Sequence, residues 1–313
     1  MNWLTSYEQD LEFAFRDAEE ILSAMPEGFR GRAIGYLDKF HALKEHRSKN
    51  YICYLLPYWL RKASGAKQED CHRFAVANLF GMMYYHLVDE AMDEPEAKSK
   101  FQLPLADLVR FEFMHIYSGY FPASSPFWAY YRKYAAEWAD AVTLENVNDF
   151  FQEDPVRVAH KASPVKLTVA GTLLLTGREQ LIPEWEAAVD TVLVTLQMLD
   201  DWEDWEKDLR EDSYNCLIST IQKELGIPRD RRPTSEEIKQ AIFVQDILSI
   251  YALRADRNHE ALSGISGLLP HLFEFHDDLR RNVNQGAQKL QKERNLLMGG
   301  GLEYWLSKNM KGS

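Results

Sequence analysis

The sequence predicts an all-α protein, and three observations support this fold class. Glycine and proline are sparse, at 16 and 12 of the 313 residues, and most lie between segments with helical periodicity. Strand-like alternation and the Asn-Gly or Asp-Gly dipeptides of hairpin turns are nearly absent. Two long segments, 69–94 and 182–209, are almost uniformly apolar over their central thirds. A helix that is apolar on all sides belongs inside a bundle of other helices.

Helical periodicity and end signals predict the individual elements in order. The expected helices are 3–24, 31–47, 51–64, 69–94, 104–119, 126–142, 156–177, 182–209, 213–224, 234–262, 268–292 and 300–310. Pro95 closes the helix at 69–94, Gly177 marks the end of the helix at 156–177, and Pro183 opens the helix at 182–209. Without an internal repeat or a low-complexity linker, residues 1–313 are expected to form one domain.

Charge and cysteine content exclude several classes of protein. The formal net charge of -12 and the pI of about 5.3 argue against a nucleic-acid partner and a polybasic membrane patch. Cys53, Cys71 and Cys216 are widely spaced and form neither a metal-binding pattern nor a disulfide framework, which favours the cytoplasm. No signal-peptide pattern begins the chain, and no apolar run approaches the roughly 20 residues that span a bilayer. We expect no transmembrane segment.

The first long apolar segment ends in a cluster of acids. After Val88 the sequence continues with Asp89 and Glu90, followed by Asp93 and Glu94. Residues four apart lie about 40° apart around a helix, so Asp89 and Asp93 share one face.

The second long apolar segment ends in the same way, with the stretch "QMLDDWEDWEKD". Asp200, Asp204 and Asp208 follow one another at intervals of four along one helix face, with Asp201 to one side. Like charges at this spacing destabilise a helix by a few tenths of a kcal/mol per pair, and partial burial adds to the cost. The helix dipole also disfavours carboxylates at a C-terminus.

Divalent cations would offset the cost of both acidic clusters. Ligands that are all carboxylate oxygens, without histidine or cysteine, favour Mg²⁺ over zinc. Because Mg²⁺ keeps water positions open, a phosphate group is the expected remaining ligand. Either cluster alone is more typical of a solvated helix end, and it is the occurrence of two that favours a metal site.

A cationic segment precedes the apolar run at 167–177. Arg157 and Lys161 lie four residues apart, with His160 and Lys166 nearby, and are expected to neutralise a diphosphate. Taken alone, they are equally typical of surface charges at the start of a helix.

These motifs resemble those of the isoprenoid synthase superfamily, an all-α fold in which two acidic motifs bind three Mg²⁺ ions and a prenyl diphosphate. The segment 89–94, "DEAMDE", resembles the first motif, D-D-x-x-D, with Glu90 at its second position. The second stretch resembles the N-D-x-x-S-x-x-x-E motif of class I terpene cyclases, and the matching residues are Asp200, Asp201, Asp204, Asp208 and, at the lysine that often precedes the last acid, Lys207.

A second resemblance stays open at the same residues. Gln197, Asp200, Asp201 and Asp204 also match the Q-x-x-D-D-x-x-D motif of trans-prenyl diphosphate synthases, and "HKASPVKL" is similar to a lysine segment of these elongating enzymes. Their G-K-R-x-R-P segment and their arginine pair after the first motif are missing. Arg157 lies near the position of the diphosphate-sensing arginine of cyclases, but the Arg-Tyr pair of many bacterial cyclases is missing too.

The resemblance implies a divergent bacterial-type terpene synthase, a Mg²⁺-dependent lyase with a central apolar cavity. The implied metal ligands are Asp89, Glu90, Asp93, Asp200, Asp201, Asp204 and Asp208. Arg157 and Lys161 would bind the diphosphate and assist its departure. The further implied substrate contacts are Lys207, Gln197, Tyr85 and Phe80. Tyr84, Phe113 and Tyr117 are other aromatic candidates, although core packing is the more common reason for a ring at each of these positions.

Other functions are weighed beside this one. A trans-prenyl diphosphate synthase is the main alternative, followed by a non-catalytic helical scaffold. A di-iron carboxylate bundle, which needs a Glu-x-x-His on two helices, is the least favoured function, and Glu112–His115 has this spacing. His271 and His276 are expected to be ordinary helix residues. A prenyl diphosphate is the expected partner, and a homodimer is left open.

Overall fold

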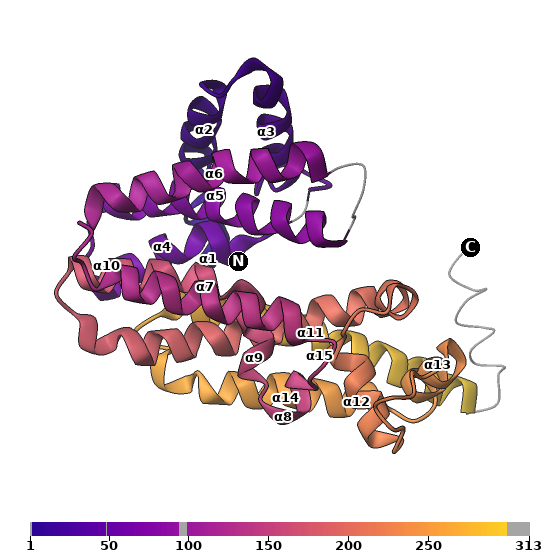
Figure 1. Ribbon diagram of the computed structural model, residues 1–313. Helices are drawn as coiled ribbons and strands as arrows, with labels where there is room; N and C mark the ends of the chain where they lie inside the picture. The colour runs from indigo at the N-terminus through magenta and orange to yellow at the C-terminus, as the bar shows by residue number, and fades with distance from the viewer. Residues whose placement is uncertain (1, 48, 94–98, 299–313) are drawn as a thin grey trace, which may run out of the picture. The chain divides into compact units, whose positions relative to one another are not determined.

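The computed structural model describes residues 2–47, 49–93 and 99–298, and these residues are helical with no strand (Figure 1). The all-α prediction is confirmed. None of the described helices is both long enough and apolar enough to cross a membrane.

The chain divides into two compact units. Unit 1 comprises Met1–Trp138, Ala162–Val189 and Gly267–Glu274, and unit 2 comprises Ala139–Lys161, Asp190–Ser266 and Phe275–Ser313. The sequence contains no sign of this division, because each unit combines segments that are far apart in the chain and no linker separates them. Among the described residues, the helices that contribute to both units are α7 (Phe127–Leu144), the 3₁₀ helix η1 (His160–Lys166), α11 (Ile182–Glu211) and α15 (Pro270–Met298).

Unit 1 is built around one long helix. Its elements are α1 (Asn2–Thr5), α2 (Glu8–Ser23), α3 (Glu27–Lys39), α4 (Tyr51–Ser64), α5 (Gln68–Asp93), α6 (Ser99–Tyr120), α10 (Leu167–Leu175) and η2 (Glu179–Leu181). The helix α5 makes its most extensive contacts with α6, followed by α4 and α2. These neighbours explain why its middle is apolar all round.

Unit 2 combines shorter helices with the second half of α11 and most of α15. The shorter helices are α8 (Phe150–Glu153), α9 (Val156–Ala159), α12 (Cys216–Glu224), α13 (Ser235–Phe243), α14 (Ile247–Ala261) and η3 (Ser263–Ile265). The helix α12 contacts α8, α13 and α14. Leu217, Ile221, Tyr251 and Val283 are among the side chains fully buried in this unit.

Local chemistry interrupts several helices that periodicity predicts as continuous. The expected helix at 156–177 becomes α9, the 3₁₀ segment η1 (His160–Lys166) and α10, because Pro164 lacks the N–H of a regular turn. The expected helix at 234–262 breaks between α13 and α14, where Asp246 has a left-handed backbone with φ of 62°. Residues 300–310 lie outside the described part of the chain.

Candidate functional site

One acid of the second acidic stretch is a structural residue. Asp201 is only 3% exposed, and its Oδ1 accepts a hydrogen bond from Gln197 Nε2 at 2.6 Å. Its Oδ2 accepts a hydrogen bond from the backbone N–H of Cys216, also at 2.6 Å. The carboxylate of Asp201 therefore fastens α11 to the start of α12. Asp201 and Gln197, which the motifs place among the metal ligands and substrate contacts, are hydrogen-bonded to each other.

Three other acids of the stretch crowd one face of α11. Asp200 and Asp204 are exposed, and Asp208 is half-buried. Desolvation by the surrounding protein, and then the negative charges of Asp201, Asp204 and Asp208, raise the pKa of Asp200 to about 6, although part of the side chain reaches solvent. Burial raises the pKa of Asp208; the hydrogen bond from Asn215 opposes this effect, and the charges of Asp201 and Asp204 add to it. The folded chain thus holds these charges together at an energetic cost.

The side chains of Asp200, Asp204 and Asp208 have the chemistry of a cation site, but they do not converge on one point. Within the described residues, no three histidine, cysteine or carboxylate side chains converge on a point where a metal ion would sit. Asp200, Asp204 and Asp208 nonetheless offer the hard oxygen ligands that Mg²⁺ prefers, and their mutual repulsion is what a divalent cation would relieve. We call these three residues the acidic face.

Asn215 connects the acidic face to the next helix. It is 2% exposed, and its Nδ2 donates to the backbone oxygen of Asp201 at 2.6 Å and to Asp208 Oδ2 at 2.7 Å. Its Oδ1 caps α12 by accepting from the backbone N–H groups of Leu217 and Ile218, at 2.9 and 3.0 Å. Sequence reasoning missed Asn215, whose only signal is an asparagine before an apolar helix.

A second missed residue, Arg232, secures the end of α11. Its Nη2 donates to the backbone oxygens of Asp208 and Ser213, at 2.7 and 3.2 Å, and its guanidinium forms an ion pair with Asp212. The last carbonyl groups of a helix lack partners within it, so a cation here also complements the helix dipole. Asp208 is therefore held at its side chain by Asn215 and at its backbone oxygen by Arg232.

The cationic residues predicted for a diphosphate have partners within unit 2. Lys161 forms an ion pair with Glu145. Burial acts to lower the pKa of Lys161, but Glu145 and Asp201 outweigh this effect and raise it, so the lysine stays charged. The guanidinium of Arg157 lies over the ring of Phe150, 4.1 Å from its centroid. Lys207 is more exposed and lies 3.8 Å from a carboxylate oxygen of Glu211.

The first acidic cluster belongs to unit 1, at the end of α5. Asp89 is exposed, whereas half-buried Glu90 accepts hydrogen bonds from Lys39 Nζ at 2.6 Å and Gln102 Nε2 at 3.2 Å. Partial burial acts to raise the pKa of Glu90, but these donors, Lys39 above all, lower it. Glu90 is thus already neutralised. The side chain of Asp93 and the whole of Glu94 lie outside the described residues.

The aromatic candidates of unit 1 are packed against one another. Phe80, Phe113 and Tyr117 are fully buried in the core. Tyr85 is half-buried and meets Trp138 edge-on, with ring centroids 4.9 Å apart. Unit 1 also has an open pocket of about 750 Å³ beside α6 and α7, and its lining includes Met114, Phe121, Trp128 and Tyr131.

The indole of Trp202, in the acidic stretch of α11, packs against Gly286 of α15. A Cβ atom added to Gly286 would lie 1.7 Å from Cη2 and 2.4 Å from Cζ2 of the Trp202 indole. The indole therefore occupies space that only glycine leaves free, and this contact orients the second half of α11.

Gly286→Ala is expected to destabilise the protein by about 2 kcal/mol, because the indole must move and overpacking of this kind costs about 1–3 kcal/mol. Denaturant unfolding followed by circular dichroism and tryptophan fluorescence measures the change. Gly35→Ala in α3 is the matched control, since nothing lies within 4 Å of its added Cβ. It should stabilise the protein by about 0.5–1 kcal/mol through helix propensity. Equal effects of the two substitutions would contradict the packing role of Gly286.

No family model, no curated protein and no solved structure matches the chain. A function therefore has to be argued from the side chains themselves.

Proposed function

We propose that this protein is a Mg²⁺-dependent class I terpene synthase, which ionises an allylic prenyl diphosphate and releases a terpene hydrocarbon or alcohol. The observation that carries the proposal is the acidic face of α11, where desolvation, and then the like charges of neighbouring carboxylates, raise the pKa of Asp200 to about 6. A folded protein gains nothing from this crowding unless a cation offsets it. The all-α architecture and the resemblance of both acidic motifs support the same function.

The acidic face would hold the metal ions, and the residues around it would keep it in position. Bound Mg²⁺ supplies Lewis-acid stabilisation of the departing diphosphate. Asp201 and Asn215 fasten the acidic stretch to α12 and need not touch the substrate. Lys161, kept charged by Glu145, would neutralise diphosphate oxygens together with Arg157.

The first acidic motif stays a prediction from the sequence. Three Mg²⁺ ions would require Asp89 and Asp93 as further ligands. Glu90 is the weakest member of the predicted set, because Lys39 and Gln102 already occupy its carboxylate. A homodimer and a cytoplasmic location are likewise expectations from the sequence.

The test is product analysis with purified full-length protein, Mg²⁺ and geranyl, farnesyl or geranylgeranyl diphosphate, each with and without isopentenyl diphosphate. We expect a hydrocarbon or alcohol from the allylic substrate alone, and no product when EDTA removes the metal. A longer diphosphate formed only with isopentenyl diphosphate would assign the protein to the trans-prenyl diphosphate synthases. Absence of turnover, together with absence of Mg²⁺ binding, would favour the scaffold.

A further inference from the structure

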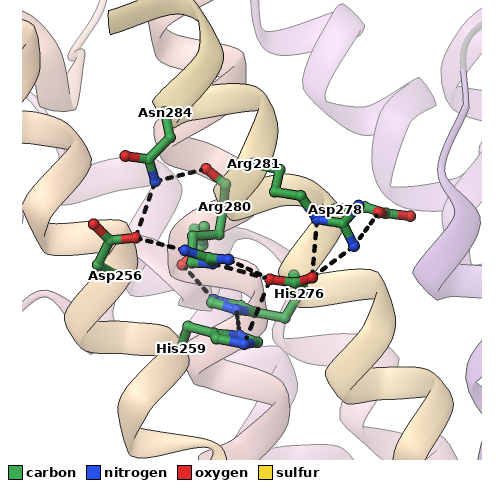
Figure 2. Close-up of polar contacts among 9 residues, drawn as sticks. Asp256, His259, His276, Asp278, Arg280, Arg281 and Asn284 are labelled. Carbon is green, nitrogen blue, oxygen red and sulfur yellow. Dashed lines mark hydrogen bonds and ion pairs between the residues drawn. The ribbon is translucent and has the colours of Figure 1, made fainter. Parts of the chain in front are cut away.

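Half-buried His259 and fully buried His276 of unit 2 form a polar chain that the proposed function does not use (Figure 2). His259 of α14 and His276 of α15 face each other with their Nδ1 atoms 3.0 Å apart and their rings nearly parallel. His276 Nε2 lies 2.8 Å from Thr195 Oγ1 of α11. At the outer end, His259 Nε2 lies 3.5 Å from Asp277 Oδ1. The chain runs from partly exposed Asp277 to fully buried Thr195.

Only one hydrogen fits between the two Nδ1 atoms, so one histidine must donate and the other must accept. With both imidazoles neutral, the hydrogen bonds of the chain therefore all point the same way. In one arrangement the Thr195 hydroxyl donates to His276 Nε2, and His276 Nδ1–H donates to His259 Nδ1. The remaining hydrogen, on His259 Nε2, then faces the Asp277 carboxylate. Every group has a partner while both imidazoles are neutral, and Asn258 Nδ2 donates to Thr195 Oγ1 at 2.9 Å.

A proton added to His259 reverses this direction. The His259 imidazolium carries hydrogens on both nitrogens, so its Nδ1–H must donate to a bare His276 Nδ1. His276 accommodates it by carrying its own hydrogen on Nε2, which donates to Thr195 Oγ1. The Thr195 hydroxyl then turns to the backbone oxygen of Thr191, 3.4 Å away. One proton has been gained, on His259, while His276 has changed tautomer and remains neutral.

We propose that His259 and His276 form a proton-driven switch in which uptake of one proton reverses a hydrogen-bond chain joining α14, α15 and α11. Only the hydrogen positions and the Thr195 rotor need to change, because the heavy-atom distances serve both arrangements. The switch goes beyond the proposed function and does not depend on it.

The charges around the pair determine which ring takes the proton. Burial lowers the pKa of His259, Asp277 and Asp256 act to raise it, and Arg280 and Arg281 act to lower it. Burial, and then His259 and Arg280, lower the pKa of His276 to about 3. His259 is therefore the first to be protonated, below its ordinary pKa of about 6.5. It also borders a depression of about 510 Å³, whose other charged lining residues are Asp256, Arg257, Glu260 and Arg280.

Arg280 holds the two carboxylates beside His259 in place. Its Nη1 donates to Asp256 Oδ1 at 3.0 Å, and its Nη2 donates to Asp277 Oδ1 at 2.6 Å, while Asn284 Nδ2 donates to Asp256 at 2.9 Å (Figure 2). Arg281 bonds the second oxygen of Asp277 at 2.6 Å and forms an ion pair with Asp278 at 3.1 Å. These contacts hold the carboxylates of Asp256 and Asp277 in place, so protonation of His259 changes the hydrogen-bond chain and not the positions of these carboxylates.

The switch is tested by nitrogen NMR of the full-length protein labelled with ¹⁵N-histidine, from pH 8 to pH 5. We expect the His276 hydrogen to move from Nδ1 to Nε2 with the same midpoint at which His259 gains its proton. In His259→Asn the tautomer of His276 should no longer change with pH. The matched control is His271→Asn, which removes another half-buried histidine of α15 and should leave the transition intact. A fixed His276 tautomer in the wild type, or a transition that persists in His259→Asn, would overturn the proposal.

A second variant keeps both imidazoles. Asp277→Asn removes the carboxylate that favours the imidazolium, so the midpoint of the coupled transition should fall by about one pH unit. A midpoint that is unchanged or higher would contradict the assigned role of Asp277 and, with it, the direction of the chain.

Discussion

Asp200→Asn is expected to lower kcat/KM for a prenyl diphosphate by about 10²–10³-fold, while making the metal-free protein more stable. The loss of activity follows from removing one ligand of the cation that stabilises the leaving group, an effect of this order for a single electrostatic contact. The gain in stability follows because the carboxylate is partly desolvated and held among like charges, which together raise its pKa to about 6. With allowance for its exposure to solvent, the gain is about 1 kcal/mol.

The pH dependence of stability has a definite sign for Asp200. Because its folded pKa lies above the unfolded value of about 3.9, the native state binds the proton more tightly. In the metal-free protein Asp200 therefore contributes stability that is lost as pH rises from about 4 to 6, and Asp200→Asn lacks this contribution, so its stability relative to the wild type should increase over that range. Thermal unfolding across this pH range measures the difference.

Magnesium and a neighbouring acid provide the controls for Asp200. Saturating Mg²⁺ should raise the Tm of the wild type by ligand linkage and raise that of Asp200→Asn much less. Glu206→Gln removes an exposed acid from the same stretch but not from the acidic face, and should leave both the Mg²⁺ response and turnover unchanged. Equal losses in the two variants would point to bulk charge and would count against a metal site.

Asn215→Ala is expected to destabilise the protein by about 3 kcal/mol and to weaken Mg²⁺ binding. Loss of the cap of α12 contributes about 1 kcal/mol, and loss of the bonds to Asp201 and Asp208 contributes about 1 kcal/mol each. Without its donor, Asp208 is no longer held on the acidic face. Denaturant unfolding and calorimetric Mg²⁺ titration measure the two effects separately.

Two comparisons separate the cap of Asn215 from its contact with Asp208. Asn215→Ser keeps a capping oxygen but not the long amide donor, so it should retain about 1 kcal/mol more stability than Asn215→Ala while losing the same Mg²⁺ affinity. Thr234→Ala removes the capping box of α13 and should cost about 1 kcal/mol without affecting Mg²⁺ binding. If Asn215→Ala is no worse than Thr234→Ala, the bonds to Asp201 and Asp208 contribute little.

Sequence patterns predict the features that depend on neighbouring residues along one helix. The apolar runs identify α5 and α11, and Pro183 and Gly177 mark the helix ends because their backbone preferences are local. The spacing of four also predicts that the charges of Asp204 and Asp208 act on Asp200. These predictions require no knowledge of which helices touch.

The remaining features depend on contacts between distant segments. Asp201 looks like its acidic neighbours in the sequence, and only its contact with the Cys216 backbone identifies it as structural. Lys161 likewise reveals its partner, Glu145, only in the folded chain. The break at Asp246 escapes prediction because a left-handed backbone at a residue other than glycine has no reliable local signal.

The bond from Cys216 to Asp201 spans fifteen residues, and so ties the last turns of α11 to the first turn of α12. Local unfolding of either segment must break this bond, so the two should open together as one cooperative unit in native-state hydrogen exchange. The amide of Cys216 then reports how often the acidic end of α11 comes apart. A cation bound to Asp208 would slow its exchange, so ligand occupancy could be followed at a site that the ligand never touches.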